Sequence, residues 1–264
     1  MAFADVNGQH LYYQDTGGNG PVIVFSHGLM MDHDMFAPQV EALRDRYRCI
    51  TWDERGHGET ATENPEPFSY YDSADDLAAL LDHLEVERAV LAGMSQGGFL
   101  SLRCALTHPE RVQALILLDT QAGKEEEDKL PMYQQLIGTF MEQGLTPMIG
   151  NTIAQIILGN GFADADTWKA KWQKISPANI ANNFQALTSR DDVTGRLHEI
   201  SQPALVVHGD ADIAIPLERA RIMADQLPDA ELVIVPGAGH AANLSHPEPV
   251  NRALEAFLDK LFGT

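Results

Sequence analysis

The sequence predicts an α/β fold with an eight-stranded, mostly parallel sheet, helices on both faces and an inserted helical cap. Short, continuous apolar runs such as residues 22–25 and 112–118 are typical of parallel strands that are buried on both faces. Helical patterns alternate with these runs, which indicates βα units. Residues 122–200 break the alternation with four helical stripes and no strand pattern. The 264 residues, 44% of them hydrophobic, suffice for one sizeable core.

The first two strands are expected to form a hairpin. Alternating segments at residues 2–6 and 10–15 are joined by Asn7 and Gly8, the strongest signal for a two-residue hairpin turn. An antiparallel ribbon therefore starts the sheet. The other expected strands cover residues 22–25, 49–52, 88–92, 112–118, 204–208 and 232–235.

Amphipathic helices are expected between the later strands. One helix carries Ala74, Leu77, Leu81 and Leu84, with Asp72 or Ser73 as its expected N-cap. Another helix covers residues 217–227. The remaining core helices carry Phe36, Val40 and Leu43, then Phe99, Leu100, Leu102 and Leu106, and finally Val250, Leu254, Phe257, Leu258 and Leu261.

Residues 122–200 are the expected four-helix cap, inserted into a core formed by residues 1–121 and 201–264. Its stripes are Met132, Leu136 and Phe140; Ile149, Ile153 and Ile157; Trp168, Trp172 and Ile175; and Ile180, Phe184 and Leu187. Most of these side chains should pack helix against helix. A minority should form an apolar ceiling over a pocket, since Met is adaptable and Trp is amphipathic.

Charge and composition exclude several classes of partner. Lys and Arg total 18 against 38 Asp and Glu, and the net charge of -20 should repel nucleic acid and anionic membrane surfaces. No run approaches the roughly 20 apolar residues of a membrane span. The first residues have neither a basic start nor an apolar core for export, so we expect a cytoplasmic protein. Cys49 and Cys104 are expected to be buried thiols.

Ser95 is the expected nucleophile. It lies in the sequence Gly-Met-Ser-Gln-Gly-Gly at residues 93–98, between a strand pattern and a helical pattern. Such a sharp turn strains its corner residue and requires nearly side-chain-free neighbours, which Gly93 and Gly97 provide. The helix N-terminus beneath the corner has free backbone N–H groups, which favour a developing negative charge.

His240 and Asp212 are expected to activate Ser95, because all three follow predicted strands at the carboxyl edge of the sheet. A serine hydroxyl needs a positioned base, and the imidazole needs an anion on its other nitrogen. Asp210 competes with Asp212 but is better suited to capping the turn after residue 209, and Asp119 is the fallback acid. The order Ser, Asp, His distinguishes this arrangement from other serine-triad folds.

A tetrahedral oxyanion also requires two N–H donors. The expected donors are the backbone amides of Gln96 and Leu29, with Met30 as a weaker alternative to Leu29. Residues considered for substrate contact are His27, Met94, Met132, Phe140 and Trp168. His27 has a second interpretation, in which it shapes its loop through hydrogen bonds to the backbone. Arg190 is either a carboxylate anchor or, as its acidic neighbours at residues 191 and 192 favour, part of a surface ion pair.

Five motifs together resemble the α/β-hydrolase superfamily. They are Ser-His-Gly at 26–28, Asp-Glu-Arg-Gly-His-Gly at 53–58, the serine motif at 93–98, Gly-Asp-Ala-Asp at 209–212 and Gly-Ala-Gly-His at 237–240. The resemblance assigns the oxyanion hole to Leu29 and Gln96 and a structural role to Asp53, Arg55 and His57. Serine at the elbow departs from the dehalogenase and epoxide-hydrolase branches, whose nucleophile is Asp. The cap resembles the esterase, enol-lactonase, C–C hydrolase and cofactor-free haloperoxidase or perhydrolase branches.

These observations predict a serine hydrolase that cleaves a small to medium carboxylic ester or lactone through an acyl-enzyme, with no cofactor and no metal. C–C bond hydrolysis and perhydrolysis on the same triad remain alternatives, as does a non-catalytic ligand receptor on this scaffold. Ten histidines suggest a metallohydrolase, but no His-Glu-x-x-His spacing occurs. The expected partner is a small acyl compound, and the oligomeric state stays open. Activity should rise with pH near the ordinary histidine pKa of about 6.5.

Overall fold

The computed structural model describes residues 2–263, which form one eight-stranded sheet in the order β1-β2-β4-β3-β5-β6-β7-β8. The strands are β1 (Ala2–Val6), β2 (Gln9–Asp15), β3 (Val22–Ser26), β4 (Arg48–Trp52), β5 (Ala89–Met94), β6 (Val112–Leu118), β7 (Ala204–Gly209) and β8 (Ala230–Val235). β1 and β2 pair antiparallel, as do β2 and β4, while every other pairing is parallel. The predicted fold class is confirmed.

The helices follow the strands in an α/β order along the chain. They are α1 (Ala37–Leu43), α2 (Tyr70–His83), α3 (Gln96–Thr107), α4 (Leu130–Gln143), α5 (Pro147–Leu158), α6 (Ala165–Trp172), α7 (Pro177–Ser189), α8 (Leu217–Gln226), α9 (Ala242–Ser245) and α10 (Pro247–Phe262). Short 3-10 helices are η1 (His33–Phe36), η2 (Gly58–Thr60), η3 (Pro109–Arg111) and η4 (Thr194–Glu199). Within residues 2–263, no helix is both long and apolar enough to cross a membrane.

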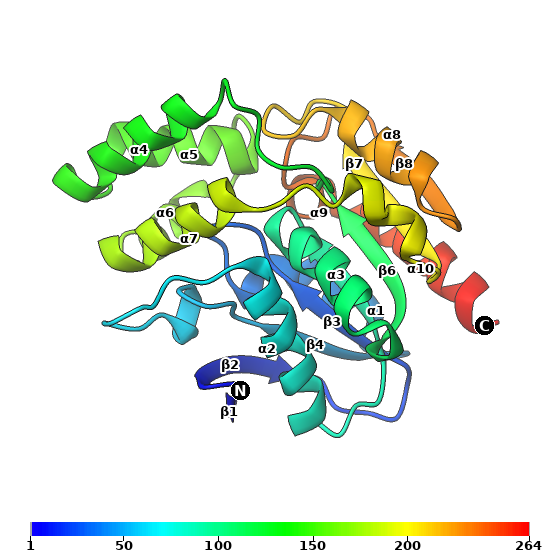
Figure 1. Cartoon of the computed structure of the whole chain (residues 1–264). Coiled ribbons are helices and arrows are strands. Elements are labelled where there is room, and N and C mark those ends of the chain that lie inside the picture. Colours follow the sequence, from blue (N-terminus) through cyan, green and yellow to red (C-terminus); the bar gives the residue numbers. More distant parts are fainter. Residues whose placement is uncertain (1, 264) are drawn as a thin grey trace.

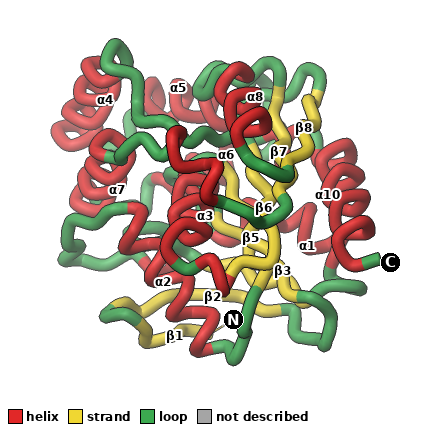
Figure 2. Tube along the Cα trace, turned by 45° about the vertical axis from the view of Figure 1, so that its right-hand side comes forward, coloured by secondary structure: helices red, strands yellow, loops and turns green. Residues whose placement is uncertain are grey.

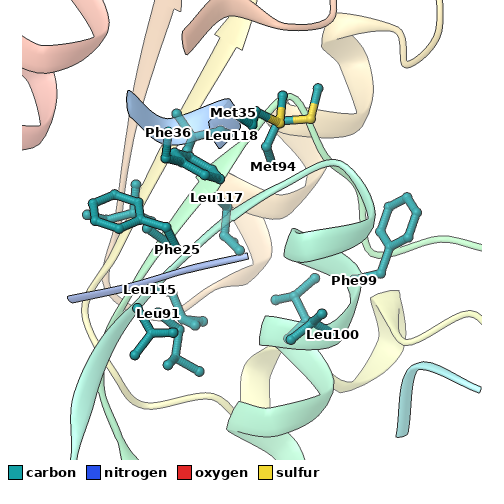
Figure 3. Close-up of a cluster of buried hydrophobic side chains, with 14 of the residues drawn as sticks. Phe25, Met35, Phe36, Leu91, Met94, Phe99, Leu100, Leu115, Leu117 and Leu118 are labelled. Carbon is teal, nitrogen blue, oxygen red and sulfur yellow. The ribbon is translucent and has the colours of Figure 1, made fainter. Parts of the chain in front are cut away.

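Helices cover both faces of the sheet (Figures 1 and 2). α1 and α10 pack together on one face, and α2 packs beside α3 on the other. Side chains of the central strands are buried on both faces, which is why these strands read as continuous apolar runs. Figure 3 shows part of this core, where Leu91 and Leu115 lie side by side and Phe25 packs beside Phe36.

The chain between β6 and β7 forms α4 to α7, which lie together on the side of the sheet toward which β6 points (Figure 1). A backbone hydrogen bond of 3.0 Å from Val193 N–H to the Ala122 oxygen closes the base of this segment. Lys171 of α6 pairs with Asp32 and Asp34 of the loop after β3, at 2.7 and 2.6 Å. Three asparagine amides of α7 donate to backbone oxygens of core loops: Asn179 to Thr62, Asn182 to Pro65 and Asn183 to Gly56.

The start of α2 corrects one expectation. Neither Asp72 nor Ser73 is the N-cap; Ser69 is, in a capping box with Asp72. The Ser69 side chain accepts from the Asp72 N–H, and one Asp72 carboxylate oxygen accepts from the Ser69 N–H at 2.7 Å. The helix therefore begins four residues before Ala74, the first residue of its apolar stripe, because capping depends on local hydrogen bonds that apolar periodicity does not report.

Two serine substitutions test this assignment. Ser69→Ala removes the cap and should lower the free energy of unfolding by about 1 kcal/mol. Ser73 is fully buried, and its hydroxyl has no hydrogen-bond partner among residues 2–263, so Ser73→Ala loses no hydrogen bond of this hydroxyl and should not lower that free energy. Urea unfolding of both variants measures the difference. Equal destabilisation by the two substitutions would contradict the assignment.

Candidate active site

Ser95 occupies the corner between β5 and α3 in a backbone conformation that non-glycine residues rarely adopt, with φ 51° and ψ −112°. Such a conformation costs about 1–3 kcal/mol and must be held by its surroundings. The Ser95 N–H donates to the Leu118 oxygen at 2.9 Å, and the Thr120 hydroxyl donates to the Ser95 oxygen at 2.7 Å. The last residue of β6 and the loop that follows it therefore hold the backbone of Ser95 in place.

Two glycines allow the chain to turn at Ser95. A Cβ at Gly93 would lie 2.2 Å from the Gly97 oxygen, and a Cβ at Gly97 would lie 2.0 Å from the Ser26 oxygen. Real Cβ atoms essentially never approach this closely. The first turn of α3 thus packs directly against the end of β3, next to the loop that carries Leu29.

The structure brings Ser95, His240 and Asp212 together from three distant parts of the chain. His240 Nε2 lies 3.0 Å from Ser95 Oγ, and His240 Nδ1 lies 2.8 Å from Asp212 Oδ2. Because a carboxylate can only accept hydrogen bonds, Nδ1 carries the ring proton and donates a hydrogen bond to Asp212. The lone pair of Nε2 is then left facing the serine hydroxyl. This is the geometry of a nucleophile beside an oriented base.

The electrostatics of the pair favour a charged imidazole. Burial lowers the pKa of His240, but the charge and hydrogen bond of Asp212 outweigh burial, so this pKa lies above its ordinary value of 6.5. Burial raises the pKa of Asp212, but the charge and hydrogen bond of His240 hold it below its usual 3.8. Asp212 Oδ1 also accepts from the N–H groups of Ala214 and Ile215, at 2.8 and 3.0 Å, which fixes the carboxylate.

The two competing acids have other partners. Asp210 accepts from the Gly237 N–H at 2.6 Å and so spans the turns after β7 and β8. Asp119, at the end of β6, is fully buried. Its two oxygens accept from the N–H groups of Gly209 (2.8 Å) and Ala242 (3.1 Å). Asp119 thus links the loop that bears Asp212 to the loop that bears His240, without contacting the imidazole.

His27 holds the loop after β3 through two hydrogen bonds to backbone groups. Its Nε2 accepts from the Glu54 N–H at 3.0 Å, so its Nδ1 carries the proton and donates to the Gly28 oxygen at 2.8 Å. Burial lowers the pKa of His27, which keeps the ring neutral. These contacts agree with the loop-shaping interpretation of His27, and the side chain is fully buried and does not line the cavity near Ser95.

The turn after β4 makes scaffold contacts. Asp53 pairs with His33 at 2.8 Å, and Arg55 pairs with the buried Asp76 through two bonds of 2.5 and 2.8 Å. His57 Nδ1 lies 2.9 Å from the Arg55 oxygen, and burial lowers the pKa of His57 to about 3. These side chains stiffen the core beside the loop after β3, as the resemblance implied.

A cavity of about 80 Å³ lies against Ser95 and His240. This volume is several-fold smaller than the roughly 300–1,000 Å³ of sites for drug-sized ligands. The lining residues are mostly apolar: Gly28, Leu29, Met30, Met94, Ser95, Phe99, Glu125, Tyr133, Leu136, Ile153, Ile156, Ile157, Phe184, Leu187, Ala214, Ile215 and His240. The site therefore suits a small ligand with a largely apolar body.

Of the residues considered for substrate contact, Met94 lines this cavity, whereas Met132, Phe140 and Trp168 do not. Met132 is 51% exposed on the outer face of α4. Phe140 and Trp168 are buried in packing away from the cavity. The expected face of α4 was the one that carries Met132, Leu136 and Phe140. The face that lines the cavity carries Tyr133 and Leu136, so the helix is rotated slightly from the expected orientation.

Arg190 neither lines the cavity, as a carboxylate anchor would, nor forms the expected surface ion pair with its acidic neighbours. It is buried, and its Nη1 pairs with the buried Glu125 at 3.2 Å. Asp191 pairs instead with Arg103. Glu125 was not expected at the site, because it stands in an acidic run at residues 125–128 of the kind that is usually solvated. No local signal marks Glu125 as a residue that faces a cavity.

One group of side chains has the spacing of a metal site within residues 2–263. Ligand atoms of Asp119, His208 and Asp212 lie within 4.8 Å of one another. Backbone N–H groups already point at both oxygens of Asp119, and His208 Nε2 lies 2.9 Å from the Ile215 oxygen. Donor dipoles aimed at the carboxylates disfavour a cation, so these residues fit a hydrogen-bond network better than a metal.

The sequence profile of the family described as "alpha/beta hydrolase fold" matches residues 21–247. A pimeloyl-[acyl-carrier protein] methyl ester esterase of Nitrosomonas europaea is 31% identical over 244 residues, covering 89% of this chain and 94% of the esterase. A solved thermophilic esterase from Thermogutta terrifontis has a TM-score of 0.86 and 29% identity, covering 96% of this chain and 94% of its own. A solved enol-lactonase from Burkholderia xenovorans has a TM-score of 0.88 and 25% identity, covering 97% and 99%.

The close approach of α3 to β3 can be tested at Gly97. In Gly97→Ala, the new Cβ meets the Ser26 oxygen, and we expect the free energy of unfolding to fall by about 3 kcal/mol or more. The matched control is Gly138→Ala in α4, where a Cβ has open space, and the same change should raise that free energy by about 0.5–1 kcal/mol. Chemical denaturation measures both. A tolerated Gly97→Ala would mean that the packing at the elbow is looser than described.

Proposed function

Because the chain belongs to the α/β-hydrolase fold family, we propose that it is a serine hydrolase that cleaves a small carboxylic ester or lactone through an acyl-enzyme. The observation that carries this proposal is the continuous hydrogen-bonded chain from Ser95 through His240 to Asp212, next to a small apolar cavity. The esterases and the enol-lactonase among its relatives support the reaction class.

In the first half of the reaction, Ser95 attacks the substrate carbonyl. As the bond from Oγ to the carbonyl carbon forms, the hydroxyl proton moves to His240 Nε2, 3.0 Å away. The imidazolium is stabilised by the negative charge of Asp212 at 2.8 Å. His240 then gives this proton to the leaving oxygen when the carbon–oxygen bond breaks, which frees the alcohol and leaves the acyl group on Ser95.

The tetrahedral oxyanion requires donors beside Ser95, and we propose the backbone N–H groups of Leu29 and Gln96. Gln96 is the first residue of α3, where an N–H has no acceptor within the helix. Leu29 lines the cavity next to Ser95. The helix dipole of α3 adds a partial positive charge at the same point. Removing one such donor typically costs about 2.7–4 kcal/mol of barrier.

In the second half, water replaces the alcohol. His240 Nε2 takes a proton from a water molecule, whose oxygen attacks the acyl carbon, and then returns the proton to Ser95 Oγ as the ester bond breaks. The released products are a carboxylic acid and the regenerated enzyme. We propose that residues 122–200 act as the cap that keeps bulk water from this site, since α4, α5 and α7 contribute seven of the seventeen lining residues.

A substrate panel tests the proposal. Small esters, lactones and vinylogous diketones should be assayed on the wild type, on Ser95→Ala and on the control Ser73→Ala, with and without peroxide. We expect hydrolysis of small esters or lactones, lost by about 10⁴-fold or more in Ser95→Ala and kept in Ser73→Ala. A fluorophosphonate probe should label only proteins that keep Ser95. Ligand binding without labelling would indicate a receptor, and turnover of diketones or peroxide in place of esters would indicate the alternative chemistries.

The pH dependence follows from the His240–Asp212 pair. Only neutral His240 can accept the serine proton, and its raised pKa moves the loss of kcat/KM on acidification to a midpoint above 6.5. This midpoint corrects the sequence-based expectation of a limb near the ordinary value. In Asp212→Asn, the midpoint should fall because the charge that raises the pKa is gone, and kcat should drop by about 10⁴-fold. A wild-type midpoint at or below 6.5 would contradict the proposed role of Asp212.

A further inference from the structure

Glu125 is a charged group in an otherwise apolar wall. Of the described residues that line the cavity, it alone carries a carboxylate, and it shares that cavity with Ser95 and His240. Its side chain is only 5% exposed. A carboxylate buried in apolar surroundings is costly to keep unless it is paired. Its position therefore calls for an explanation beyond packing.

Arg190 forms an ion pair with Glu125 from behind the wall of the cavity. Its Nη1 lies 3.2 Å from Glu125 Oε2, and it also donates to the backbone oxygens of Gly123 and Leu187. The guanidinium stacks over the Phe99 ring, with its central carbon 4.3 Å from the ring centroid. Arg190 does not line the cavity itself. The ion pair therefore has its acidic member in the wall of the cavity and its basic member behind that wall.

Glu125 also has spare capacity as an acceptor. Oε2 accepts from Arg190, and Oε1 accepts from the Glu126 N–H at 3.3 Å. A carboxylate offers about four lone-pair sites on its two oxygens, so two such bonds leave room for another donor. The other polar groups of the lining are the hydroxyls of Ser95 and Tyr133 and the His240 imidazole.

We propose that Glu125 selects the substrate: the site prefers small esters that carry a neutral hydrogen-bond donor, a hydroxyl or an amide N–H, and rejects esters that carry a carboxylate. The donor binds the free acceptor sites of Glu125. A substrate carboxylate would meet a like charge in an apolar cavity of about 80 Å³, where little water can screen the repulsion. This selectivity rests on the proposed function, because it concerns substrates of the same Ser95-dependent reaction.

Two matched substrate series test the selectivity. On the acyl side these are methyl butanoate, methyl 3-hydroxypropanoate and monomethyl malonate; on the alcohol side they are propyl acetate, 2-hydroxyethyl acetate and carboxymethyl acetate. We expect wild-type kcat/KM to favour the hydroxyl ester over the carboxylate ester by about 10- to 100-fold in at least one series, the range for a hydrogen bond to a charged group. Acid release in a pH-stat measures every member without a bulky chromophore.

Variants of Glu125 identify the cause. In Glu125→Gln the preference for hydroxyl over carboxylate should fall by about 10-fold or more, because the facing charge is removed while Arg190 remains. The methyl-terminated esters are the reference within each variant, because the charge of Glu125 also raises the pKa of His240 and its removal acts on all the esters alike. The double variant Glu125→Leu with Arg190→Met removes both charges and should lose the preference without leaving a buried charge unpaired. The matched control is Glu126→Gln, which removes the neighbouring carboxylate outside the cavity lining and should keep the wild-type ratio.

The outcomes separate the two proposals. Equal hydrolysis of carboxylate and hydroxyl esters by the wild type, or an unchanged ratio in both Glu125 variants, would overturn the role of Glu125 while Ser95-dependent hydrolysis stands. A change in Glu126→Gln as large as in Glu125→Gln would also overturn it, since the effect would then be general charge. Failure of every ester, or hydrolysis that survives Ser95→Ala, would overturn the proposed function and this selectivity with it.

Discussion

The packing of α3 against the end of β3 is the constraint on which the site depends. Neither Gly93 nor Gly97 has room for a Cβ, so the chain can reverse at Ser95 only with this local sequence. The reversal forces Ser95 into its strained conformation and directs its hydroxyl beyond the sheet, toward His240. The same contact brings the N-terminus of α3 next to the loop after β3. A single steric fit thus positions Ser95, the proposed nucleophile, and the two amides proposed to stabilise the oxyanion.

Buried carboxyl groups organise the loops around Ser95. Burial and the charge of Asp212 raise the pKa of Asp119 well above its usual range, whereas Asp212 stays ionised beside His240. Two neighbouring carboxyls in a low dielectric cannot both carry charge cheaply, so their environments separate their roles. Asp119 connects the loops of Asp212 and His240 through backbone N–H groups, and Asp212 supplies the charge. The position of the imidazole depends on both.

The helical segment is attached to the core on one side and lines the cavity on the other. Lys171 of α6 and three asparagines of α7 bind core loops through polar contacts. α4, α5 and the inner face of α7 contribute apolar side chains to the cavity, and Glu125 with Arg190 adds an ion pair at that wall. Polar contacts with core loops thus hold these apolar side chains next to Ser95 and His240.

The sequence by itself determined the fold class, the eight strands and the convergence of Ser95, His240 and Asp212. Apolar runs, strand-to-helix turns and glycine positions are local, and parallel strands bring their carboxyl ends to one edge whatever the details. Only the tertiary structure decided which face of α4 meets the cavity, where α2 is capped and what Glu125 contacts. Arg190 lies 65 residues after Glu125 in the chain. An acidic run has the same composition whether water solvates its carboxylates or a guanidinium pairs with one of them. Such pairings depend on how helices rotate and dock, which periodicity does not encode.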